Sequence, residues 1–264
     1  MTMKMIDVGG AAIRYMDKGS GPAVLFLHGF PLSFAMWDGQ EPLAERYRLI
    51  RFDARGFGGS DVGDSLLTMD RIADDAAALI GKLRLGPVVL VGCSMGGYAA
   101  FSFVRKYSSL LRGLVLVDTR AGADAMEARI QRGQLAARVI KEGARSAMEA
   151  FLPKIVGEST KKSRADVIAK LKDMMLAAPP QGISNALHGL AARADSTSTL
   201  REISVPTLVV CGEEDVITPV AEAQKMQRGI SGAELAVIPK SGHLPPIETP
   251  EAFNAVLSEF LSRF

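Results

Sequence analysis

The chain has 264 residues, which is enough for one large domain with a sizeable core or for a core that carries an insertion. Its 31 basic and 29 acidic residues leave a formal charge of +2, which gives no reason to expect nucleic acid or an anionic membrane as a partner. The opening residues MTMKMIDVGG lack the apolar run of a secretory signal, and no apolar run approaches a membrane span, so we expect a soluble cytoplasmic protein.

Short apolar runs alternate with amphipathic stretches along the chain. The first two runs, KMIDV and AAIRYMD, flank Gly9-Gly10 and predict an antiparallel hairpin. Six later runs resemble strands buried on both faces: 23–28, 48–53, 87–92, 113–118, 206–212 and 234–239. Helical patterns occupy 68–83, 95–106, 220–228 and 250–263. This alternation is typical of an α/β protein with a mostly parallel central sheet and helices on both faces.

Residues 121–200 interrupt the alternation. They contain several helical patterns, such as AMEARIQRGQLAARVIKEG, and no run that resembles a strand. We interpret them as a helical insertion, so that residues 1–120 and 201–264 form the core. The insertion holds 12 Lys and Arg against 8 Asp and Glu, and the remainder holds 19 against 21. We interpret the positive excess of the insertion as solvated helix faces.

Ser94 lies where an apolar run meets a helical pattern. The pentapeptide Gly92-Cys93-Ser94-Met95-Gly96 fits the pattern G-x-S-x-G, and the strand–turn–helix context that this motif requires is present. A turn from strand to helix within one residue strains that residue and crowds its second neighbours, so only glycine fits at 92 and 96. The turn would project the serine hydroxyl above the end of the sheet, beside the positive end of a helix. We predict Ser94 as a nucleophile.

A serine hydroxyl needs a base to remove its proton, and the base needs a third group to orient it. The chain has three histidines. His28 ends a buried run too early in the chain for the order Ser, acid, His, and His188 lies in the helical insertion. His243 lies in a loop between the last strand and the last helix, from which it can reach Ser94, so it is the candidate base.

The acid has two candidate positions, because Asp118 and Asp215 each follow a strand at the same end of the sheet. We prefer Asp215, since the preceding residues GEE give it a loop that can reach behind the histidine. We expect Asp118, at the tip of its strand, to cap the entry to the insertion. The two cysteines, Cys93 and Cys211, are too few for a metal site or a disulfide framework, and we expect both to be buried.

Five ordered motifs resemble those of the α/β-hydrolase superfamily, and together they span nearly the whole chain. They are HGFP (28–31), DARGFGGSD (53–61), GCSMGG (92–97), GEEDVITP (212–219) and GHLPPIETP (242–250). The chain is most similar to the small bacterial carboxylesterases, with hydrolases of the 3-oxoadipate enol-lactonase type as close kin.

The resemblance implies Ser94 as nucleophile, Asp215 as acid and His243 as base. It also implies an oxyanion hole formed by the backbone N–H groups of Phe30 and Met95, and a cap function for the insertion. Haloalkane dehalogenases and epoxide hydrolases share HGFP but have aspartate in place of Ser94, so those activities are not expected. Enol-lactonase relatives usually have an aromatic-rich cap, whereas this insertion has Phe151 as its single aromatic residue.

The expected reaction is hydrolysis of carboxylic esters with short to medium acyl chains, through an acyl-enzyme and without a metal or organic cofactor. The alternatives are a lactonase of the 3-oxoadipate enol-lactone type, a hydrolase of C–C bonds, and a ligand-binding member with slow turnover. Pro31, beside Phe30, also leaves open a side reaction with hydrogen peroxide, which the resemblance implies for some esterases.

The substrate pocket is the least defined part of the site. Trp37, Leu152 and His188 are the candidate substrate-binding residues. The insertion also carries four methionines, whose adaptable side chains would favour loose specificity if they line the pocket. Packing of the same methionines against the core is an equally good interpretation. The apolar candidates from the insertion are Met126, Met148, Met174, Met175, Leu152, Ile155, Leu187 and Leu190.

Overall fold

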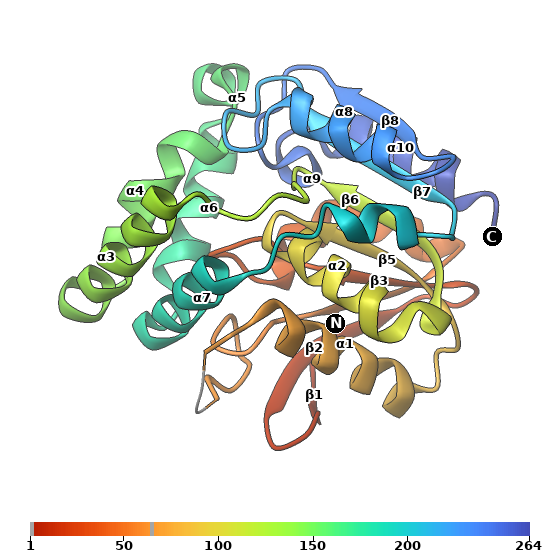
Figure 1. The fold of residues 1–264 in the computed structure, drawn as a ribbon, viewed down its shortest axis with the longest axis horizontal. Coiled ribbons are helices and arrows are strands. Elements are labelled where there is room, and N and C mark those ends of the chain that lie inside the picture. Colours follow the sequence, from red (N-terminus) through yellow and green to blue (C-terminus); the bar gives the residue numbers. More distant parts are fainter. Residues whose placement is uncertain (1–2, 64–65) are drawn as a thin grey trace.

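The computed structural model describes residues 3–63 and 66–264. Its centre is an eight-stranded sheet in the order β1-β2-β4-β3-β5-β6-β7-β8 (Figure 1). The first two pairings, β1 with β2 and β2 with β4, are antiparallel, and all the others are parallel. The strands are β1 (Lys4–Asp7), β2 (Ala12–Lys18), β3 (Ala23–Leu27), β4 (Arg48–Phe52), β5 (Val88–Cys93), β6 (Leu111–Val117), β7 (Thr207–Gly212) and β8 (Glu234–Ile238).

The predicted hairpin and the mostly parallel sheet are confirmed. β1 and β2 pair across a turn in which Gly9 and Gly10 have φ angles of +79° and +85°, a region that glycine enters without steric cost. One strand differs from its prediction. β8 is not buried on both faces, because it lies at the edge of the sheet, and of its five residues only Ile238 is buried. An apolar run alone does not distinguish an edge strand from a central one.

Helices cover both faces of the sheet, and each face has its own apolar core. Successive residues of a strand point to opposite faces. In β5, Val88 and Leu90 therefore pack in one cluster with α1 and α2, whereas Val89 and Val91 pack in the other with η1 and α10. The helices of the two faces are α1 (Met69–Leu83), α2 (Met95–Tyr107) and α8 (Val220–Gly229) on the first, and η1 (Phe34–Glu45), α9 (Pro245–Glu248) and α10 (Pro250–Leu261) on the second.

All of the regular secondary structure between β6 and β7 is helical, as predicted. Its main helices gather on one side of the molecule, away from the C-terminus (Figure 1). We call residues 121–200 the helical segment. It contains α3 (Met126–Glu142), α4 (Arg145–Ile155), α5 (Glu158–Ser163), α6 (Ala165–Leu176), α7 (Pro180–Ala192) and most of η3 (Ser198–Glu202).

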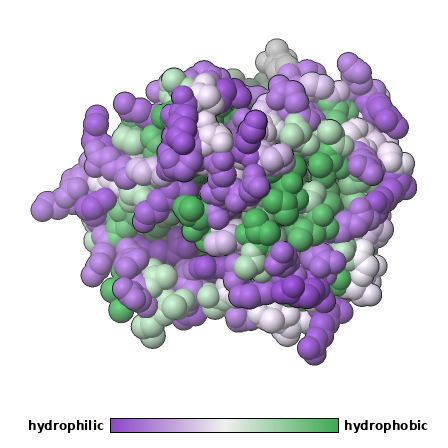
Figure 2. Space-filling model, turned by 90° about the horizontal axis from the view of Figure 1, so that it is seen from above, coloured by the Kyte–Doolittle hydropathy of each residue, from purple (hydrophilic) through white to green (hydrophobic). Residues whose placement is uncertain are grey.

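The face shown in Figure 2 is mostly hydrophilic, with one area where apolar residues gather. Within residues 3–63 and 66–264, no helix combines the length and the apolar character that crossing a membrane requires. Cys93 and Cys211 are both buried with free thiols, as expected.

Candidate active site

Ser94 occupies the single residue between the end of β5 and the start of α2. Its φ of +50° and ψ of −110° are strained for a residue with a side chain, and such conformations cost about 1–3 kcal/mol each. A Cβ atom at position 92 would collide with the carbonyl oxygen of Gly96, and one at position 96 with that of Leu27. The structure thus confirms the predicted turn and the need for both glycines.

A continuous chain of hydrogen bonds links Ser94 to a histidine and a carboxylate. The Nε2 atom of His243 lies 2.9 Å from Ser94 Oγ, and its Nδ1 atom lies 2.8 Å from Asp215 Oδ2. His243 and Asp215 are only 3% and 5% exposed. The loops after β7 and β8 thus bring two side chains to the serine from positions 121 and 149 residues further along the chain.

The loop after β7 holds Asp215 in place. Its Oδ1 accepts hydrogen bonds from the backbone N–H groups of Ile217 (2.7 Å) and Thr218 (3.1 Å), and its Oδ2 accepts one from Thr218 Oγ1 (2.6 Å). Burial alone would raise the pKa of this carboxyl, but His243 and the bonds from Thr218 outweigh it and hold the pKa well below its usual range. An ionised Asp215 accepts the Nδ1–H of His243, which leaves Nε2 free to accept the serine proton.

Asp118, the other candidate acid, lies close by but does not bond to the histidine. Its Oδ1 accepts a hydrogen bond from the backbone N–H of Gly212 (2.8 Å), and its Oδ2 has no partner among the described residues. Asp118 therefore braces β7 and does not cap the helical segment, contrary to our expectation. Burial, followed by the nearby charge of Asp215, raises the pKa of Asp118 well above its usual value.

Asp118, Asp215 and His243 also form, among the described residues, one cluster of side chains that could bind a metal ion. Both ring nitrogens of His243 already have partners, Ser94 on one side and Asp215 on the other. The hydrogen bonds of a Ser–His–Asp system therefore account for the cluster without a metal.

Two residues with backbone N–H groups unpaired among the described residues line the same cavity as Ser94. Phe30 and Met95 both line it, and neither N–H donates to an acceptor within the described part of the chain. Met95 is also the first residue of α2, where the partial positive charge of the helix is greatest. These are the two groups that the sequence comparison with α/β-hydrolases implied for an oxyanion hole.

The loop that carries Phe30 is braced by buried polar groups. His28 donates from Nδ1 to the Gly29 carbonyl (2.9 Å) and accepts at Nε2 from the backbone N–H of Ala54 (3.0 Å). Burial lowers the pKa of His28, which keeps the ring neutral and able to play both parts. Asp53 accepts the backbone N–H of Phe34 at 2.7 Å. The motifs HGFP and DARGFGGSD therefore shape this loop together.

The helical segment also contacts the loop of the histidine. The backbone N–H of His243 donates to the carbonyl oxygen of Ile155 at the end of α4 (3.2 Å). The buried carboxylate of Glu248 accepts from Gly157 (2.8 Å) and from Leu244 (3.0 Å), so it joins the two segments. The position of the histidine thus depends on the helical segment as well as on the core.

Two adjoining cavities lead to Ser94. The inner one has a volume of about 30 Å³, and the outer one about 440 Å³; they share Arg132, Phe151 and Ile217. The lining of the inner cavity is mostly apolar. It consists of Phe30, Ser94, Met95, Tyr98, Arg132, Phe151, Ile155, Leu190, Ile217 and His243.

The three predicted substrate-binding residues do not line the inner cavity. Trp37 is fully buried in the second core cluster, where its ring centre lies 5.0 Å from that of Phe26. Leu152 packs against the same cluster, because one residue along α4 turns the side chain by about 100° from the direction of Phe151. His188 is exposed on the outer side of α7.

The methionines of the helical segment do not line the inner cavity either. Met126 is 70% exposed, and Met148 and Met175 are buried in the second core cluster. The partly buried Met174 packs against that cluster, with its sulfur 3.3 Å from the backbone N of Ser33. The interpretation that the methionines pack the segment on the core is therefore correct for Met148, Met174 and Met175, whereas the exposed Met126 neither packs there nor lines the cavity. Sequence reasoning missed Tyr98, Arg132 and Ile217 as lining residues, since nothing in their local pattern marks them.

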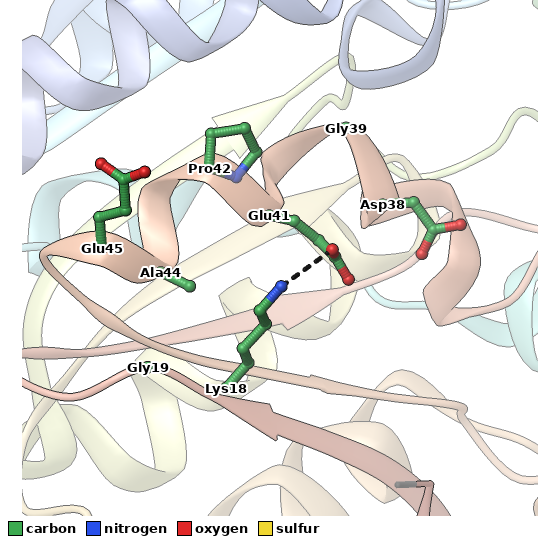
Figure 3. Close-up of a pocket in the computed structure, with 8 residues that line it drawn as sticks. All are labelled: Lys18, Gly19, Asp38, Gly39, Glu41, Pro42, Ala44 and Glu45. Atoms are coloured by element: carbon green, nitrogen blue, oxygen red, sulfur yellow. Dashed lines mark hydrogen bonds and ion pairs between the residues drawn. The ribbon is translucent and has the colours of Figure 1, made fainter. Parts of the chain in front are cut away.

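A further pocket lies at the opposite end of the sheet and lacks this chemistry. Figure 3 shows it around the ion pair between Lys18 and Glu41 (3.0 Å), and its volume is about 630 Å³. Lys18 pairs with Leu49 near the amino end of β4, whereas Ser94 follows the carboxyl end of β5. The lining contains no Ser, Cys or His, so it offers no pair of nucleophile and base.

Comparison with known proteins agrees with this architecture. Residues 22–250 match the family model described as the alpha/beta hydrolase fold. The structure superposes with a TM-score of 0.96 on a thermophilic esterase from Thermogutta terrifontis with malate bound, which is 42% identical and matches over 100% of this chain and 99% of that one. A 3-oxoadipate enol-lactonase from Acinetobacter baylyi is 30% identical, over 95% of this chain and 92% of its own. A non-heme haloperoxidase from Rhodococcus erythropolis is 32% identical, over 96% of both chains. The chain belongs to the α/β-hydrolase family, and it is a hydrolase of that fold.

Proposed function

We propose that this protein is a serine hydrolase that cleaves carboxylic esters of short to medium acyl chain through an acyl-enzyme. The observation that carries the proposal is the hydrogen-bond chain from Ser94 through His243 to Asp215, on a strained turn at the end of the sheet. A nucleophile, a base and an orienting acid within hydrogen-bond reach are the groups that acyl transfer to water requires. No metal or organic cofactor enters the reaction.

In the first half of the reaction, His243 Nε2 takes the hydroxyl proton of Ser94 as its Oγ attacks the ester carbonyl. The carbonyl oxygen becomes an oxyanion, which the N–H groups of Phe30 and Met95 stabilise; a donor of this kind is worth about 2.7–4 kcal/mol. The bond to the alkoxy oxygen then breaks, and His243 gives its proton to the departing alcohol. Asp215 remains ionised and stabilises the imidazolium.

In the second half, water attacks the acyl carbon while His243 takes a proton from it. The Ser94 oxygen leaves and recovers its proton from the histidine, which releases the carboxylic acid. One ester and one water thus become one acid and one alcohol, and the enzyme returns to its starting state.

We assign residues 121–200 as a cap on a core formed by 1–120 and 201–264. This assignment is supported by the cavity lining, to which the helical segment contributes Arg132, Phe151, Ile155 and Leu190. The small inner cavity favours short acyl groups, and the larger outer cavity offers room for a longer chain or for the alcohol.

A lactone is a second candidate substrate class, because the same attack opens a cyclic ester. It is supported by the similarity to the 3-oxoadipate enol-lactonase of Acinetobacter baylyi. The ester class is supported by the 42% identical esterase. Comparing kcat/KM of the purified protein for simple esters and for simple lactones would show which of these two substrate classes it prefers.

The deciding experiment is hydrolysis of p-nitrophenyl esters with acyl chains from acetate to octanoate. We expect turnover to be fastest for the shorter chains. Ser94→Ala should lower kcat by about 10⁴-fold or more, because the base and the acid contribute little to catalysis once the nucleophile they activate is removed. Ser108→Ala is the matched control, because Ser108 is exposed next to the end of the same helix. Turnover by folded Ser94→Ala near the level of the unaltered protein would refute the assignment.

A further inference from the structure

One cation of the helical segment faces the reaction site. Arg132, on α3, lines both the inner cavity with Ser94 and His243 and the outer cavity. Its Nε donates to Asp124 Oδ2 at 2.6 Å, and its two Nη groups make no hydrogen bond within the described residues. The side chain is 18% exposed. Arg132 is therefore held at one edge of its guanidinium, and the other edge is free to bind a ligand.

Arg132 is held by the buried carboxylate of Asp124, which forms ion pairs with three arginines. Asp124 is 4% exposed and also pairs with Arg120 (2.5 Å) and Arg193 (3.0 Å). Burial alone would raise the pKa of Asp124, but the charges of Arg132, Arg193 and Arg120 outweigh it and lower the pKa. One ionised carboxylate thus faces three guanidinium groups, which leaves a positive excess beside the reaction site.

The lining of the outer cavity is also mostly positively charged. Its charged lining residues are Arg120, Arg132, Arg138 and Lys154 against the one carboxylate of Asp124. The whole chain is almost balanced, at a formal charge of +2, so the concentration of cations is local. We interpreted the positive excess of residues 121–200 as solvated helix faces, and for Arg132 that interpretation is wrong. A cleft with charge of one sign attracts ligands of the other sign.

We propose that the site selects esters that carry a free carboxylate, bound by the Nη groups of Arg132 while the ester carbonyl lies at Ser94. The proposal rests on the ester hydrolysis proposed above. A guanidinium fork binds a carboxylate through two parallel hydrogen bonds, with geometric specificity that a lysine lacks. Among the four cations of the outer cavity, Arg132 is the one that also reaches the inner cavity.

The carboxylate can belong to either half of the substrate, and substrates of equal carbon number separate the two cases. Ethyl butyrate is the neutral reference. Monoethyl succinate places a carboxylate at the end of the acyl chain, and O-butyrylglycolate places it on the alcohol. We expect kcat/KM for one of the two charged esters to exceed that for ethyl butyrate by about tenfold or more, which corresponds to about 1.4 kcal/mol. Acid release measured by pH-stat titration gives all three values.

The test of Arg132 is the ratio of kcat/KM for the preferred charged ester to that for ethyl butyrate within each variant. A ratio cancels any loss of folded enzyme. Arg132→Gln should lower the ratio by about tenfold, and Arg132→Lys should give an intermediate value. Arg145→Gln is the matched control, since Arg145 is an exposed arginine of the same segment and lines neither cavity. The preference should also shrink as salt screens the cations.

The outcomes separate this proposal from the one on which it rests. If ethyl butyrate is hydrolysed in a Ser94-dependent manner but neither charged ester is preferred, the carboxylate proposal is overturned and ester hydrolysis stands. The same follows if the preference survives Arg132→Gln, or falls equally in Arg145→Gln. If none of the three esters is hydrolysed, the proposed function itself fails.

Discussion

The two acids at the carboxyl end of the sheet should respond very differently to the same substitution. Asp215 accepts the Nδ1–H of His243 at 2.8 Å and fixes the ring so that Nε2 faces Ser94 as a base. In Asp215→Asn, the amide can donate to Nδ1 instead, and the histidine would then present an N–H to the serine. A wrong tautomer of this kind lowers kcat by about 10⁴-fold, or about 5.4 kcal/mol of transition-state stabilisation.

Asp118→Asn should lower kcat by less than about tenfold. The raised pKa of Asp118 favours the protonated form of its carboxyl, and an amide of the same shape still offers an oxygen to the backbone N–H of Gly212. The difference between the two variants is therefore expected to be about three orders of magnitude, far beyond the error of the assay.

The assay is kcat for p-nitrophenyl butyrate, with thermal unfolding of each variant as the check that it remains folded. An equal loss in the two variants would refute the assignment of Asp215 as the orienting acid. So would an Asp215→Asn protein that keeps more than a tenth of the activity, because it would show that the tautomer of His243 is set elsewhere.

Two further predictions concern stability. The pKa of Asp118 is higher in the folded than in the unfolded chain, so the contribution of its protonated carboxyl to stability is full below about pH 3.8 and declines as the pH rises toward the folded pKa. Asp118→Asn removes this pH-dependent loss, so the substitution should raise the free energy of unfolding, measured in urea, more at pH 7 than at pH 4. An equal change at both pH values would contradict the raised pKa. Gly96→Ala should destabilise the protein by about 1–3 kcal/mol or more, because its Cβ would collide with the backbone of Leu27. Gly133→Ala on α3 is the control, since its Cβ would meet nothing within 4 Å and should stabilise by about 0.4–1 kcal/mol; similar unfolding midpoints for the two alanine variants would refute the steric argument.

Local features of the chain were enough to predict the sheet and the turn at Ser94. Strand runs such as 88–93 are apolar at every position because both faces of the strand are covered, and that requirement is visible in the sequence. The turn is equally local, since strand, serine, helix and two glycines lie within a few residues of one another. The candidate base also followed from sequence reasoning, because a loop after the last strand ends at the same edge of the sheet as Ser94.

Tertiary packing alone decided which side chains surround the reaction site. Phe151 lines the cavity and its neighbour Leu152 does not, because a rotation of about 100° separates them on α4. The burial of Trp37, and the choice between Asp118 and Asp215 as the partner of His243, likewise depend on contacts between segments far apart in the chain.

Arg132 shows the same division most clearly. Its sequence surroundings are those of an ordinary polar helix, and charge on such a helix is usually solvated. Only the packing of α3 against α7 and α4, with Asp124 to hold the guanidinium, turns that charge toward Ser94. Strands and sharp turns are determined by short-range sterics and burial, which a sequence records directly. The orientation of a helix face depends on the sum of many weak long-range contacts, and the structure was needed to reveal it.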